Sequence, residues 1–147
     1  MTALHNEHVE IGYFDSDQHS GRSNLPYAQL MHILEYGASG NGVLIKPFSL
    51  FTNAAFIYVP HETTELKRII KKGLIDQMKG NGDRRLLTAI GQFYQRKIRA
   101  MFGNSSLLRD LRPDTVRRKQ STVPLIETGE LRANLGYRTS KSLKVHK

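Results

Sequence analysis

The spacing of apolar residues is strand-like near the N-terminus, helical through the middle of the chain and strand-like again near the C-terminus. Residues 7–14 alternate partially and are rich in strand-forming types, so they predict a strand. The polar stretch 15–24 predicts an exposed loop. From Pro26 onward, apolar residues recur every three to four positions, which predicts a helix that ends at Gly37.

The next segments are shorter and less regular. Residues 37–42 contain mostly Gly, Ser and Asn, and they predict a flexible turn before a short strand at 43–45. Residues 48–59 are almost uniformly apolar, a pattern that fits either a helix or a strand, and we favour a helix.

Two clearer helices follow and predict a helical hairpin. Residues 65–79 are amphipathic, and a Gly-Asn-Gly break separates them from a second helix that Asp83 is expected to cap and that ends near residue 102. The residues expected to face inward are Leu66, Ile69, Ile70, Leu74 and Met78 in the first helix, and Leu86, Leu87, Ile90, Tyr94, Ile98 and Met101 in the second.

The C-terminal third begins irregularly and ends with a second strand. Within residues 124–135 we expect an extended entry and a short helix whose N-cap is Thr128. Leu131 and Leu135 are four residues apart and so share an inward face, which leaves Arg132 in water. Residues 135–139 predict a strand. The basic tail 140–147 is expected to need a partner to hold it, and a neighbouring subunit is the economical candidate.

These elements predict one α+β domain over residues 1–147, in which a small, mostly antiparallel sheet from the N- and C-terminal segments packs against a central helical hairpin. The chain has six Tyr, six Phe and no Trp. Such a modest apolar content suits a subunit that completes its burial against neighbouring copies, although a small monomer with long loops fits nearly as well.

Charge is distributed unevenly along the chain. Residues 1–60 hold two basic and five acidic side chains, whereas the remainder holds twenty basic and eight acidic ones. This asymmetry favours contact with an acidic protein partner or with nucleic acid, and it would also let one subunit meet the next. Basic candidates for partner contact lie in the irregular segment 104–123, namely Arg109, Arg112, Arg117, Arg118 and Lys119.

The residues that could carry catalysis do not form a recognisable motif. Without Cys there is no thiol chemistry and no thiolate metal site. Among the six His, His5 and His8 are three residues apart, but their context is not helical and no third ligand lies at a recognisable spacing. The glycines at 37–42 lack the Lys-Ser/Thr pair of a nucleotide-binding loop. Glu127 and Glu130 are explained by the positive end of a helix. We therefore expect neither an enzyme nor a cofactor, and no apolar run is long enough to span a membrane.

Three segments resemble elements of one family. Pro-Leu-Ile-Glu-Thr-Gly-Glu-Leu-Arg-Ala-Asn-Leu at 124–135 resembles the C-terminal signature of tailed-bacteriophage neck and tail-completion proteins. Glu35-Tyr36-Gly37 is similar to the acid–aromatic–Gly element that closes the first helix of this family, and Lys46-Pro47-Phe48 is similar to its Arg-Pro-Phe element. Lysine here replaces the usual arginine, and residues 49–52 depart from the common Leu-Arg continuation.

The resemblance implies a structural virion protein that joins the DNA-filled head to the tail. Such subunits form rings, commonly sixfold, that contact connector, tail-terminator or tail-tube proteins after assembly in the bacterial cytoplasm. It also implies fold and interface roles for the signature residues Glu35, Tyr36, Gly37, Pro47, Phe48, Leu125, Thr128, Gly129, Leu131 and Arg132. A nonspecific DNA-binding phage protein is the alternative that the basic segment leaves open, since phosphate contacts need no recognition helix.

Overall fold

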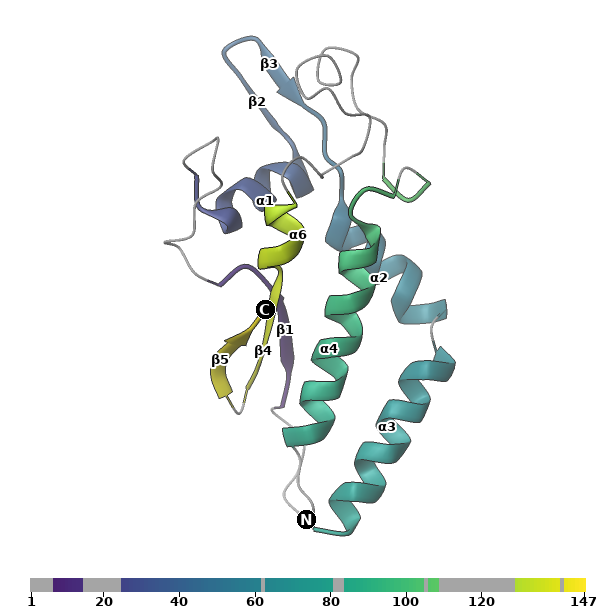
Figure 1. Ribbon diagram of the computed structural model, residues 1–147. Coiled ribbons are helices and arrows are strands. Elements are labelled where there is room, and N and C mark those ends of the chain that lie inside the picture. Colours follow the sequence, from purple (N-terminus) through teal and green to yellow (C-terminus); the bar gives the residue numbers. More distant parts are fainter. Residues whose placement is uncertain are drawn as a thin grey trace.

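The computed structural model describes residues 7–14, 25–61, 63–80, 84–104, 106–108, 129–140 and 142–147, and it confirms the predicted α+β class (Figure 1). Its elements, in chain order, are β1 (Val9–Gly12), α1 (Tyr27–Tyr36), β2 (Ala38–Gly40), β3 (Val43–Ile45), α2 (Leu50–His61), α3 (Thr63–Met78), α4 (Arg84–Met101), α6 (Glu130–Asn134), β4 (Gly136–Thr139) and β5 (Ser142–His146).

The main sheet joins the two ends of the chain, as predicted. Its three strands are antiparallel in the order β1-β4-β5, and Ile11 of β1 lies opposite Tyr137 of β4. The expectation that the basic tail needs another molecule to hold it is wrong. Residues Ser142–His146 form β5, which pairs with β4 of the same chain, and ladder hydrogen bonds therefore fix the tail.

Helix α4 lies between the sheet and α3 (Figure 1). Glycine permits the close approach on both sides. A Cβ atom on Gly91 would lie 2.3 Å from the ring of Tyr137, and one on Gly73 of α3 would lie 2.5 Å from a methyl group of Leu86. The predicted helical hairpin is confirmed, and its second helix, α4, is the layer that connects α3 to the sheet.

The prediction of which α3 residues face inward is partly wrong. Ile70, Leu74 and Met78 are exposed, Met78 to 86%. Among the described elements, α3 contacts chiefly α4, so only a narrow face of α3 is covered. Conversely, Phe93 of α4 was not predicted to face inward, yet its side chain is almost fully buried. A helix between two layers buries two faces, and a one-face pattern does not predict the second.

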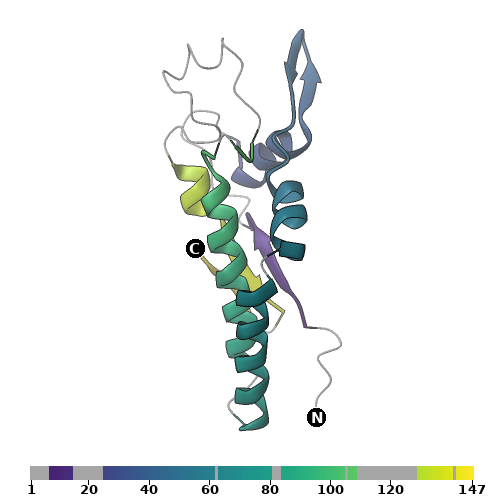
Figure 2. The same cartoon turned by 90° about the vertical axis from the view of Figure 1, so that its right-hand side faces the viewer.

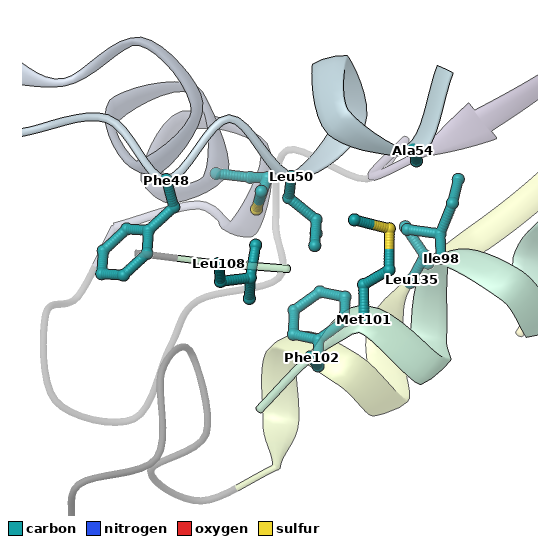
Figure 3. Close-up of a cluster of buried hydrophobic side chains, with 9 residues drawn as sticks. Phe48, Leu50, Ala54, Ile98, Met101, Phe102, Leu108 and Leu135 are labelled. Carbon is teal, nitrogen blue, oxygen red and sulfur yellow. The ribbon is translucent and has the colours of Figure 1, made fainter. Parts of the chain in front are cut away.

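A cluster of nine buried residues lies at one end of the molecule, where α1, α2, α4 and the junction of α6 with β4 meet (Figure 3). Its members are all apolar: Met31, Phe48, Leu50, Ala54, Ile98, Met101, Phe102, Leu108 and Leu135. From residues 48–59, Leu50 and Ala54 contribute to this cluster as part of α2, and Phe48 contributes from just before it. The prediction of a helix rather than a strand is therefore confirmed. Segments far apart in sequence are therefore fastened to one another at this end.

Two local predictions need correction. Residues 37–42 are not merely a turn, since Ala38–Gly40 forms β2 and pairs with β3; only Asn41 and Gly42, both with positive φ, make the turn. The N-cap of α6 is Gly129 rather than Thr128. Gly129 has φ 77°, a left-handed conformation that glycine adopts without steric cost, and no side-chain hydrogen bond caps the helix.

Candidate functional site

Glu35, at the end of α1, holds the start of α2 in place. Its side chain is only 5% exposed. The two carboxylate oxygens accept hydrogen bonds from the backbone N–H groups of Phe51 (2.9 Å) and Thr52 (2.8 Å) and from the Thr52 hydroxyl (2.8 Å). These donors belong to the first turn of α2, where a negative charge is favourable. The buried carboxylate therefore caps the N-terminus of α2.

Gly37 and Pro47 close the loop between α1 and α2. The Gly37 N–H donates to the carbonyl of Ile33 (2.7 Å), and the Phe48 N–H donates to the carbonyl of Leu34 (2.7 Å). Gly37 has φ +81°, and a Cβ there would lie 2.6 Å from the carbonyl oxygen of Ile45 and 3.1 Å from Pro47 Cδ. The Glu-Tyr-Gly and Lys-Pro-Phe segments thus meet and set the direction in which β2 and β3 leave the body.

The described part of the C-terminal signature lies on α6. The Tyr13 hydroxyl donates to the Leu131 carbonyl (2.6 Å), and the Tyr27 hydroxyl donates to Glu130 Oε2 (3.1 Å). Leu131 packs against the buried cluster, Arg132 is exposed and Leu135 is fully buried, as predicted. Burial raises the pKa of Tyr13 well above its usual range. All three signature segments are therefore joined to the same end of the molecule.

Two side chains of α4 that the sequence analysis did not single out fasten α6 and β4. The Gln95 side-chain amide donates to the carbonyls of Leu135 (2.9 Å) and His146 (3.1 Å). Arg99 donates to the carbonyls of Ala133 (3.0 Å) and Leu135 (2.9 Å). Both side chains bind the carbonyl of Leu135, which α6 leaves without a partner at its C-terminal end. A polar residue on an otherwise apolar helix face was the signal available in the sequence.

The β2–β3 hairpin, residues 38–45, projects beyond α1 and away from the other described elements; we call it the arm (Figures 1 and 2). Leu44 is 51% exposed and Ile45 is 36% exposed. Because neighbouring strand residues point to opposite sides, each face of the arm carries one of them. Tyr36 is exposed at its base. The arm therefore projects from the signature residues at its base and exposes apolar side chains to solvent.

A shallow hollow of about 320 Å³ lies between the end of β1 and helices α1 and α2. Its lining among the described residues is mainly apolar and aromatic and includes Ile11, Tyr13, Met31, Tyr36 and Phe51. The rings of Tyr36 and His32 are 4.8 Å apart. Glu35 also borders the hollow, but its oxygens are engaged by α2. The hollow thus offers a surface suited to an apolar group.

The other predicted site residues are distributed differently. Leu125, Thr128 and all five basic candidates in 109–119 lie outside the described residues. A basic surface is present instead on the outer side of α3, where Lys67, Arg68, Lys71 and Lys72 are exposed. On the sheet, the Arg138 guanidinium binds the Glu10 carboxylate and lowers the pKa of that carboxyl.

Within the described ranges, no three His, Asp or Glu side chains gather closely enough to hold a metal ion. None of the helices in this part of the chain combines the length and the apolar character needed to cross a membrane.

Comparison with known proteins gives no relative from which a role could be transferred. No family model, curated protein or solved structure matches the chain.

Proposed function

We propose that this protein is a structural subunit of the neck of a tailed bacteriophage, a ring-forming tail-completion protein that joins the DNA-filled head to the tail. The partners would be further copies of the chain and, on the two faces of the ring, connector and tail-terminator or tail-tube proteins. The proposed role is assembly of the particle rather than catalysis.

The observation that carries the proposal is the convergence of the three segments that resemble the family signature. Glu35 and Gly37 meet Pro47 and Phe48 at the base of the arm, and Leu131 packs against the same buried cluster as Phe48. These residues come from three separate parts of the sequence. Their joint role in fixing one projecting element is what a conserved assembly site in such a family would require.

The surface of the molecule also suits assembly. In the part of the chain that the structure describes, exposed apolar side chains lie on the arm and on α3, and also at Tyr36 of α1 and Phe56 of α2. Exposed apolar groups are favourable when a partner covers them. Contacts of several hundred Å² per subunit are sufficient, because closure of a ring makes each further contact intramolecular.

The proposal is tested by asking whether the protein is part of the particle. We expect quantitative mass spectrometry of purified phage particles to find a fixed, small number of copies. We also expect light scattering of the isolated protein to find a multiple of the 16.7 kDa chain mass. Absence from particles together with a monomeric mass would contradict the proposal.

A nonspecific DNA-binding protein is the second candidate, and the exposed basic residues of α3 favour it. Phosphate contacts by Lys67, Arg68, Lys71 and Lys72 would give an affinity for duplex DNA that falls steeply as salt rises. Fluorescence anisotropy with duplexes of unrelated sequence, measured between low and physiological salt, distinguishes the two. Strong, salt-dependent binding by a monomer absent from particles would favour this candidate.

A further inference from the structure

The arm has the properties of a segment that another surface covers. An isolated two-stranded hairpin is at best marginally stable in water. The ladder of this one is short, pairing Ala38 with Ile45, Ser39 with Leu44 and Gly40 with Val43. All three β2 residues are exposed. Burial of Leu44 and Ile45 against a partner would supply the stabilisation that this ladder lacks.

The arm also lacks the usual protection of an exposed strand. Proteins commonly place charged residues, Lys above all, on strands that stay in water, because these discourage pairing with other chains. Residues 37–45 contain no Asp, Glu, Lys or Arg, although the chain as a whole is rich in charge. A neutral arm fits a neutral, apolar receiving surface, and it fits the basic outer side of α3 poorly.

The same chain carries a surface of that kind. The hollow is lined by Ile11, Tyr13, Met31 and Phe51, and its bordering carboxylate, Glu35, is already bound by α2. Within the described sheet, β1 is an edge strand. A strand arriving beside it could add backbone hydrogen bonds to the burial of its side chains. Arm and hollow are thus complementary in polarity and in type of structure.

We propose that the arm of one subunit docks in the hollow of a second copy of this chain, with Leu44, the more exposed of its two apolar side chains, entering between β1 and α1. This inference depends on the proposed ring and names its subunit contact. Arm and hollow are different surfaces, so the contact can repeat head-to-tail from one subunit to the next, as the proposed ring requires. Each bound subunit still presents a free hollow or a free arm, and repetition of such a contact gives a closed ring or a filament.

The first test compares three proteins by light scattering: wild type, Leu44→Asp and a matched control, Met78→Asp. Both variants place an acid at an exposed apolar position, but Met78 lies at the far end of α3 from the arm (Figure 1). We expect Leu44→Asp to be a folded monomer, shown by unchanged circular dichroism, and Met78→Asp to assemble like wild type. An assembled Leu44→Asp, or a monomeric Met78→Asp beside it, would overturn the docking.

The second test identifies the hollow as the receptor. Ala28 is exposed on α1 and borders the hollow, so Ala28→Arg should obstruct it without disturbing the helix. Each variant alone is expected to be monomeric. A mixture should contain a dimer and nothing larger, since the intact arm of the Ala28→Arg chain can enter the intact hollow of the Leu44→Asp chain. A mixture that stays monomeric would overturn the pairing of these two surfaces.

The absence of Cys from the chain allows a direct chemical check. Chains carrying only Leu44→Cys and only Ala28→Cys are mixed and oxidised. We expect the disulfide between the two different chains to exceed either homodimer at least fivefold on a nonreducing gel. A predominance of homodimers would contradict a head-to-tail contact.

The outcomes separate this inference from the proposed function. Assembled wild type whose mass is unaffected by Leu44→Asp would overturn the arm contact alone and leave the ring intact. Normal rings that no longer join tails would show that the arm binds a different protein of the particle. A monomeric wild type that is missing from particles would overturn both.

Discussion

Glu35 shows how one residue can determine the geometry of a loop. Its carboxylate is buried, yet each of its oxygens accepts hydrogen bonds from the first turn of the next helix. A buried charge is tolerated when hydrogen bonds satisfy it in this way. An acid at this position is therefore required by structure, without any catalytic role.

Replacing Glu35 by Ala should lower the free energy of unfolding by about 3 kcal/mol, because two buried N–H donors lose their acceptor. Glu35→Gln, whose amide oxygen can still accept one of them, should lose about half as much. Urea denaturation measures both. Glu65→Ala, which removes a partly exposed carboxylate bound to Arg96 and Lys97, is the control and should cost under about 1 kcal/mol. Equal losses for Glu35→Ala and the control would contradict the cap.

Gly37, at the base of the arm, and Gly42, in its turn, provide a matched comparison. Both have positive φ, but a Cβ on Gly37 would meet the Ile45 carbonyl at 2.6 Å, whereas nothing lies within 4 Å of one on Gly42. Gly42→Ala should cost about 1 kcal/mol through backbone strain alone. Gly37→Ala should cost about 3 kcal/mol, because the backbone of the arm must also move. Thermal unfolding measured by calorimetry checks the order, and a smaller loss for Gly37→Ala would refute the close contact.

Tyr13 should make the protein sensitive to alkali. Burial raises the pKa of its hydroxyl in the folded state, so the unfolded chain releases this proton first, near pH 10. The stabilisation is complete below that pH and is lost as the pH rises above it. Tyr13→Phe should lose about 1 kcal/mol at pH 7 with the hydrogen bond to Leu131. Its unfolding free energy should then fall less steeply above pH 10 than that of wild type, and parallel curves would contradict the assignment.

The sequence predicted these residues unevenly. Gly37 was identified as a helix stop, and Leu131, Arg132 and Leu135 were assigned the correct sides of their helix. The partners of Glu35 could not be predicted, because they are backbone groups sixteen and seventeen residues further along the chain. For the same reason Gln95 and Arg99 were missed, since their acceptors are backbone carbonyls in α6, directly after it and in β5.

At the scale of elements, α4 organises the fold. It contacts the sheet through Gly91, α3 through Leu86 and the buried cluster through Ile98 and Met101. Its bounds were predicted well, from a cap at residue 83 to an end near residue 102. The outer helix α3 was predicted less well, since an apolar stripe does not reveal whether its partner belongs to the same chain.

Strand β5 should contribute strongly to stability, although its sequence resembles a loose basic tail. Ending the chain after Ser140 removes its ladder with β4, one acceptor of Gln95 and the ring of His146 that stacks on Tyr137. We expect a loss of at least about 3 kcal/mol in urea denaturation. Lys144→Ser keeps the backbone of β5 and should change stability by less than about 0.5 kcal/mol. Wild-type stability in the shortened chain would show that β5 is dispensable.

At the scale of the whole molecule, the arm and α3 present exposed side chains outside the packed core. The apolar arm leaves the end where the signature segments meet, and α3 presents apolar and basic side chains on the opposite flank of α4 (Figure 1). Neither feature contributes to the buried cluster. A protein that works by joining others would be expected to have such surfaces, and they are the physical basis of the assembly role that we propose.

Electron microscopy of a lysate from a phage that lacks this gene tests the central proposal most directly. We expect filled heads and complete tails that remain separate, and we expect wild-type protein supplied from a plasmid to restore joined particles. Joined, infectious particles in the absence of the protein would contradict a role at the head–tail junction.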